Sequence, residues 1–175
     1  MIGIPLGLAT AGAVEWTFHK YIQHGLGKDK KNFWSFHLYE HHKSVKEHQY
    51  YDPGYHRFPI GLHAQGKEIL GLLGASLLVS PLYPIAPFYV ATLHYSALRY
   101  YQVHKKSHLD PPWGRTHCPC HYDHHMGPHG NANYCILHPW FDVLMGTRRS
   151  YAGTEQERQD LARTPTPEKL LGRME

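Results

Sequence analysis

The sequence predicts an all-α protein: a helical, membrane-associated bundle with an apolar helical hairpin and a histidine-rich cap that holds a di-metal site. Histidine accounts for 17 of the 175 residues, and ten of these histidines fall in four short clusters with largely helical spacing. Residues 69–98 contain no Asp, Glu, Lys or Arg. Charged residues make up only 18% of the chain and hydrophobic residues 42%, a balance that argues against a disordered or coiled-coil protein.

The first predicted element is an apolar helix over residues 1–24. Residues 1–14 carry no charge and are rich in Gly and Ala, and the start lacks the Lys or Arg of a signal peptide. We therefore expect a helix that stays in the protein. His19 and His24 are five residues apart, which does not suit one face of a straight helix. Because Gly25 follows, we expect the helix to end there with His24 swung back at its terminus.

The second predicted element is the apolar hairpin over residues 66–106. Pro81, Pro84 and Pro87 interrupt the uncharged run, and prolines cannot continue one helix. The pattern predicts a helix from about 66 to 80, a turn with the prolines, and a second helix from about 88 to 106. The first arm is short for the ~30 Å hydrocarbon layer of a bilayer, so it either spans the membrane or dips into one leaflet. A buried hairpin in a soluble core is the alternative.

Basic residues are absent from the proline turn and from the N-terminal end, and they gather at the opposite ends of the apolar segments. By the positive-inside rule these basic ends, which also carry the histidines, face the cytoplasm. We expect one domain over residues 1–149 and a polar tail over 150–175, with a short helix at 155–162. The basic residues concerned are Lys28, Lys30, Lys31, Lys43, Lys46, Arg99, Lys105 and Lys106.

The four histidine clusters predict a metal site, because imidazole is the commonest neutral ligand for transition metals. Spacing of i and i+4 places His37 with His41, and likewise the pairs 104/108 and 121/125, on common helix faces. A doublet such as His41 and His42 can serve two centres. One metal takes three to five such ligands, so ten predict two metals. The candidate ligands are His19, His24, His37, His41, His42, His104, His108, His121, His124 and His125.

Carboxylates are few near these clusters. We expect Glu15, Glu40 and Asp123 to orient the histidine rings by hydrogen bonds. Cys118 and Cys120 are too close together for the usual zinc spacing and are expected to pack in the core, with Pro119 starting the helix of the last cluster. The remaining histidines are expected at the surface (His56, His63 and His129) or near the clusters and the hairpin (His48, His94, His117 and His138).

Charge, cysteine content and motifs exclude several classes of protein. The net charge is only +4 and no basic run exceeds three residues, so nucleic acid is not an expected partner. Three cysteines are too few, and odd in number, for a disulfide scaffold. The chain has no P-loop, no G-x-G-x-x-G and no G-x-S-x-G, which excludes nucleotide-cradling loops and a serine elbow.

The ordered clusters resemble the histidine boxes of the fatty acid hydroxylase / sterol desaturase superfamily of membrane non-haem di-iron enzymes. The resemblance covers residues 12–149 and includes a closing element at 139–148, PWFDVLMGTR. The first half is also similar to carotenoid ring hydroxylases. The resemblance implies that the boxes bind two Fe ions at the cytoplasmic face. With O₂ as co-substrate, these would oxidise an unactivated C–H bond of a fatty acyl chain, sterol or carotenoid.

The chemistry implied is hydroxylation or desaturation, which needs a redox metal and therefore favours iron, with zinc as the competing occupant of purified samples. Electrons are expected from an external donor such as a ferredoxin or a cytochrome b5-like protein. Two alternatives stay open. A di-zinc hydrolase would recruit Glu40 or Asp123 as general base. The other is a non-catalytic membrane protein that binds metal or lipid.

Overall fold

The computed structural model describes residues 2–163 and within them contains eight α-helices and no β-strand. The prediction of an all-α protein is confirmed. The predicted tail lies outside the described residues from 164 onward, whereas its expected helix at 155–162 is present as α8. The helices are α1 (Gly3–Thr17), α2 (Lys43–Glu47), α3 (Ala64–Val79), α4 (Pro87–Leu109), α5 (Pro111–His117), α6 (Pro119–Met126), α7 (Pro139–Leu144) and α8 (Glu155–Arg163).

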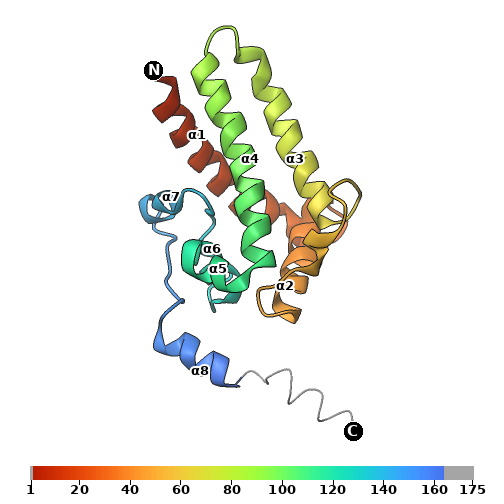
Figure 1. Ribbon diagram of the computed structural model, residues 1–175, viewed down its shortest axis with the longest axis vertical. Coiled ribbons are helices and arrows are strands. Elements are labelled where there is room, and N and C mark those ends of the chain that lie inside the picture. Colours follow the sequence, from red (N-terminus) through yellow and green to blue (C-terminus); the bar gives the residue numbers. More distant parts are fainter. Residues whose placement is uncertain (1, 164–175) are drawn as a thin grey trace.

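Three long helices, α1, α3 and α4, run side by side (Figure 1). The N-terminus and the turn between α3 and α4 lie at one end, and the short helices α2, α5 and α6 gather at the other (Figure 1). Helix α1 approaches α4 closely because its contact face carries glycine. A Cβ atom on Gly7 would lie 2.8 Å from the Cβ atom of Thr92, so only a residue without a side chain fits there.

The helical hairpin is confirmed close to its predicted bounds. Helix α3 begins where the His63 side chain accepts a hydrogen bond from the Gly66 N–H, and it ends at Val79. Pro87 occupies the first turn of α4, where its missing N–H has no helical partner to lose.

Within residues 2–163, no helix is both long enough and apolar enough to cross a membrane.

The predicted N-terminal helix continues as far as expected, but by a different geometry. After Thr17 the chain forms a π-helical segment, Phe18–Gln23, in which the His24 N–H donates to the His19 carbonyl at 2.9 Å. This i→i+5 bond replaces the α-helical i→i+4 bond. The wider turn carries His24 onto the face of His19, so no swing-back at the helix terminus is needed. A second π-helical segment spans His37–His42.

The short helices pack through aromatic and sulfur-containing side chains. All three cysteines are free and buried, and Cys118 packs against Val103 and Ile136, as expected for residues of the core. Pro119 begins α6, as predicted. Beyond it, Tyr50 and Tyr122 share a further buried cluster. These contacts fix α6 against the end of α4, where the last two histidine clusters lie.

Candidate metal centre

The ten box histidines converge at the end of the bundle that holds the short helices, and each is at most 8% exposed. Four elements supply them. These are the first π-helical segment together with His24 directly after it, the second π-helical segment, the C-terminal end of α4, and α6. Nine of the ten fall into two groups whose ligand atoms lie within 4.8 Å of one another. The five-histidine group is His19, His24, His37, His42 and His124, and the four-histidine group is His41, His104, His108 and His125.

In the five-histidine group the Nε2 atoms point at one another. The Nε2 atom of His37 lies 2.9 Å from that of His19, 3.2 Å from that of His24 and 3.1 Å from that of His42. The Nε2 atom of His124 lies 3.1 Å from that of His24. Since a metal binds imidazole nitrogen at about 2.0–2.1 Å, ligand atoms at such separations can share one ion after small adjustments.

In the four-histidine group, Nε2 atoms also face each other at short distance. The Nε2 atoms of His41 and His104 are 3.2 Å apart. His121 is the one predicted ligand outside both groups, but it lies beside this one, with its Nε2 atom 2.9 Å from that of His108.

The two groups are adjacent, because consecutive histidines divide between them. His41 and His42 belong to different groups, as do His124 and His125, which agrees with the expectation that a doublet can serve two centres. The ring centroids of His42 and His125 are only 4.2 Å apart. The expected face-sharing of His37 with His41 gives way to His37 with His42, since the π-helical segment aligns residues five apart rather than four.

Hydrogen bonds to backbone carbonyls fix the tautomers of several rings. A carbonyl oxygen can only accept, so the Nδ1 atom that faces it carries the proton. His19 donates to the Tyr134 carbonyl at 2.6 Å, and His124 donates to the Ala132 carbonyl at 2.7 Å. His108 does the same to a backbone carbonyl at 2.8 Å. When these rings are neutral, each Nε2 atom presents a lone pair to its group.

Two buried carboxylates orient rings of the four-histidine group. Asp52 accepts from the Nδ1 atom of His41 at 2.9 Å, and Glu68 accepts from that of His104 at 2.5 Å. Both rings thereby keep their proton on Nδ1, and their Nε2 lone pairs face each other across 3.2 Å. Carboxylate or carbonyl partners of this kind are typical of metal-ligating histidines. Two facing lone pairs repel, and a cation between them removes the repulsion.

The sequence did not indicate these two carboxylates, because each reaches its histidine through the fold rather than through a helical spacing. The three carboxylates expected in this role have other partners. Glu15 accepts from the backbone N–H groups of residues 136 and 137. Glu40 forms an ion pair with Lys67, and Asp123 forms one with Arg148. Among the described residues, none of the three hydrogen-bonds a box histidine.

Burial favours the neutral form of nine of the ten box histidines. It lowers the pKa of His124 to about 4 and that of His24 to about 2. Burial is also the chief cause of the lowered pKa values of His19, His37, His41, His42, His108, His121 and His125. Neutral imidazole is the form that binds a metal ion. The buried, neutral and convergent nitrogens therefore fit two ions, although this donor set does not choose between iron and zinc.

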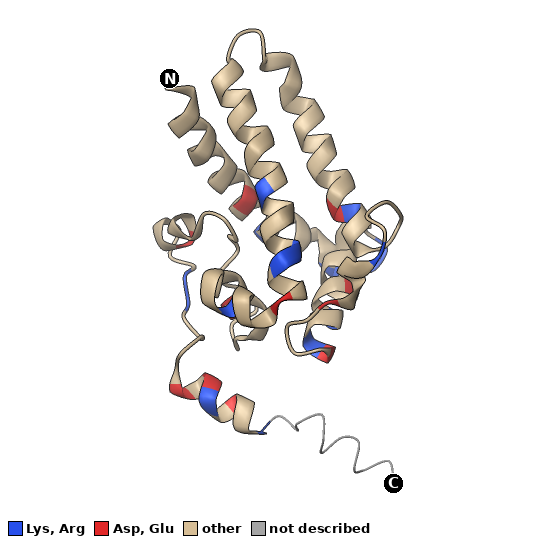
Figure 2. Cartoon of the chain, in the orientation of Figure 1, with Lys and Arg blue, Asp and Glu red and all other residues tan. Residues whose placement is uncertain are grey.

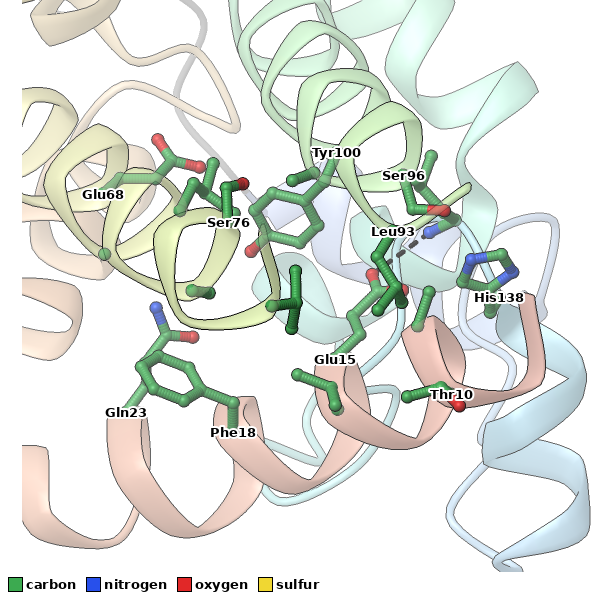
Figure 3. Close-up of a pocket in the computed structure, with 18 of the residues that line it drawn as sticks. Thr10, Glu15, Phe18, Gln23, Glu68, Ser76, Leu93, Ser96, Tyr100 and His138 are labelled. Carbon is green, nitrogen blue, oxygen red and sulfur yellow. Dashed lines mark hydrogen bonds between the residues drawn. The ribbon is translucent and has the colours of Figure 1, made fainter. Parts of the chain in front are cut away.

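A cavity of about 230 Å³ lies between α1, α3 and α4 (Figure 3). Its wall is mostly apolar, with Phe18, Leu72 and Leu93 among its side chains. Gln23 and Glu68 line this cavity and also a smaller pocket that contacts three box histidines, His37, His41 and His104. The cavity therefore leads toward the histidines.

The remaining seven histidines lie outside the two groups. His48, His56, His117 and His129 are exposed, and His63, His94 and His138 are partly buried.

Comparison with protein-family models, with curated proteins and with solved structures finds no match to this chain. The structure itself shows an all-helical protein over the described residues, with two adjacent, buried histidine groups that could hold metal ions.

Proposed function

We propose that the protein is an O₂-dependent di-iron oxidoreductase that hydroxylates or desaturates an unactivated C–H bond of a lipid. The observation that carries the proposal is the pair of all-histidine groups near an apolar cavity, which shares Gln23 and Glu68 with a pocket at three of these histidines. An apolar cavity beside a buried, all-histidine donor set suits the oxidation of an apolar substrate.

Each group supplies the ligands of one iron, with His121 available beside the four-histidine group. When bound, two irons would allow O₂ to oxidise the substrate with two electrons from an external donor and two protons from solvent. In hydroxylation one oxygen atom would enter the product and the other would leave as water, and in desaturation both would leave as water. The chain's own residues perform the remaining tasks. Asp52 and Glu68 hold the rings of His41 and His104, and the buried surroundings exclude bulk water from the centre.

The cavity supports a lipid substrate. Its wall is mostly apolar, it lies between three helices (Figure 3), and it shares Gln23 and Glu68 with the pocket at the histidines. An apolar chain inside it would lose water from its surface, which is the main driving force for binding such a ligand.

Surface composition supports insertion into one leaflet of a membrane. Lys, Arg, Asp and Glu are absent from the end of the bundle that holds the N-terminus and the hairpin turn (Figure 2). Large apolar side chains are exposed there, including Ile2 at 84%, Leu78 at 82% and Ile85 at 84%. An apolar surface of this size is typical of a membrane or partner contact. The histidine end, with its basic residues, would then face the cytoplasm.

The order of the histidine boxes supports the same proposal, because it resembles that of the fatty acid hydroxylase / sterol desaturase superfamily. By that resemblance the electron donor would be a ferredoxin or a cytochrome b5-like protein. The rival, a di-zinc hydrolase, needs a general base beside the metals. Glu40 and Asp123, its candidates, are held in ion pairs with Lys67 and Arg148 instead.

The test is a turnover assay on iron-loaded protein in detergent, with O₂, a reductant and a panel of alkane, sterol and carotenoid lipids. We expect products that gain one oxygen or lose two hydrogens, and ¹⁸O from ¹⁸O₂ in the hydroxylated ones. The variant His41→Ala should lose this activity, while Glu40→Gln, a matched change at the surface of the same π-helical segment, should keep it. Product formation without O₂, or full activity of His41→Ala, would contradict the proposal.

A further inference from the structure

The cavity wall also holds a polar group that does not line the smaller pocket at the box histidines, the carboxyl group of Glu15. Glu15 lines its α1 wall eight residues before Gln23, which corresponds to ~12 Å along a helix. Figure 3 shows the Glu15 side chain reaching into the wall near Leu93 and Tyr100. In Figure 3, Gln23 and Glu68, the residues that the cavity shares with the histidine pocket, lie on the other side of the view from Glu15.

The carboxyl group of Glu15 is held firmly in place. Its Oε1 atom accepts hydrogen bonds from the backbone N–H groups of Ile136 at 2.5 Å and Leu137 at 3.1 Å. The next residue, His138, lines the same cavity, and its Nε2 atom is buried without a hydrogen-bond partner among the described residues. Buried polar atoms are normally paired, so this nitrogen is available to hydrogen-bond a ligand in the cavity.

The charge of the lining excludes an anionic ligand. The cavity wall includes two carboxyl groups, those of Glu15 and Glu68, but neither Lys nor Arg. An anionic head group would therefore be buried without a counter-charge, which is costly. Burial also raises the pKa of Glu15 to about 7, so near neutral pH much of this carboxyl is protonated and can donate a hydrogen bond.

We propose that the cavity selects a neutral lipid with an uncharged oxygen group, a hydroxyl or a carbonyl, which Glu15 and His138 hydrogen-bond while the apolar part extends toward the histidines. The proposal rests on the proposed function for the reaction that follows binding, and it names the substrate class: neutral oxygenated lipids rather than fatty acid anions. The C–H bond that reacts is then remote from this oxygen, near the end of the cavity marked by Gln23.

The test compares three ligands with the same chain length: 1-hexadecanol, hexadecane and palmitate. Binding to the purified full chain in detergent at pH 7 is followed through tryptophan fluorescence, because Trp34 lines the cavity. Two hydrogen bonds predict that hexadecanol binds roughly 5- to 100-fold more tightly than hexadecane, and the missing cation predicts that palmitate binds most weakly. Equal binding of the alcohol and the alkane, or tightest binding of palmitate, would overturn the proposal.

Variants assign the preference to Glu15. Glu15→Leu should abolish the preference for the alcohol over the alkane, whereas Thr10→Val, an isosteric change in the same cavity, should keep it. Since Glu15→Leu also removes the acceptor of two backbone N–H groups, Glu15→Gln is the second variant. It keeps an acceptor and a neutral donor, and it should keep the preference. Loss in Thr10→Val to the same extent as in Glu15→Leu would overturn the assignment.

Metal content and O₂-dependent turnover of the same samples separate this proposal from the proposed function. A protein with two metals and turnover but no preference for the alcohol contradicts the neutral-lipid inference alone. A protein that prefers the alcohol but binds no metal contradicts the proposed function alone.

Discussion

Replacing Asp52 by Asn should weaken one of the two metal sites and spare the other. Asp52 accepts three hydrogen bonds, from His41 Nδ1 at 2.9 Å, Ser44 Oγ at 2.8 Å and the Gly54 N–H at 2.9 Å. Asparagine keeps one acceptor oxygen, which can serve Ser44 and Gly54, but its amide group then faces the proton on His41. The His41 ring loses its orientation and its preferred tautomer.

The expected loss is 10- to 100-fold in metal affinity, or about 1.4–2.7 kcal/mol, the usual effect of removing a partner that orients a ligand. It should fall on the ion of the four-histidine group, because His41 belongs to that group. The matched control is Glu40→Gln. Glu40 is also a carboxylate near His41 in sequence, but it is exposed and pairs with Lys67.

The assay is an anaerobic Fe²⁺ titration of metal-free protein against a chelator of known affinity. We expect two tight binding phases for the wild type and for Glu40→Gln. Asp52→Asn should also show two phases, of which one keeps its affinity and the other is about 10- to 100-fold weaker. Equal weakening of both phases in Asp52→Asn, or no weakening, would refute the view that Asp52 acts through His41 alone.

Further variants test the two groups, the helix packing and the buried carboxyl. His41→Ala and His42→Ala should each remove about one metal per chain, and the double variant both, as measured by elemental analysis. Gly7→Val should lower the free energy of unfolding by about 1–3 kcal/mol, since the valine side chain would overlap α4. Gly74→Ala should raise it by about 0.5–1 kcal/mol, because the added Cβ atom meets open space. Denaturant titration measures both changes. Glu15 has a pKa of about 7 in the folded protein, raised by burial from 4.5, so the folded state binds the proton more tightly and its contribution is lost as the pH rises from 4.5 through 7. Unfolding free energies of the wild type and Glu15→Gln should therefore diverge by roughly 2–3 kcal/mol in favour of the variant between pH 5 and pH 8, and a constant difference would contradict this.

Local signals in the sequence predict much of the fold. Three prolines in an uncharged run placed the hairpin turn, because proline cannot continue a helix and uncharged residues mark the apolar arms. Pro119 marked the start of α6 for a similar reason. The doublets also predicted a division between two centres, since neighbouring residues of a helix point in different directions.

The geometry of the site was less accessible from sequence. The i+5 pairs His19/His24 and His37/His42 share a group only because the chain adopts π-helical segments, and spacing rules that assume an α-helix miss this. Glu68 reaches His104 across 36 positions of sequence, a contact that depends on how α3 packs against α4. Contacts of this kind follow from tertiary packing and have no signature in spacing.

The most direct test of the account is the metal content of the full chain, purified gently in detergent without chelator. The two histidine groups predict close to two metal ions per chain. The proposed oxidative function predicts that these ions are iron, either as purified or after anaerobic iron loading. Ten buried, convergent histidines without a stoichiometric metal under either condition would contradict the central claim that these groups are a metal centre. Two zincs that iron cannot replace in an active form would contradict the oxidative function and favour the hydrolase.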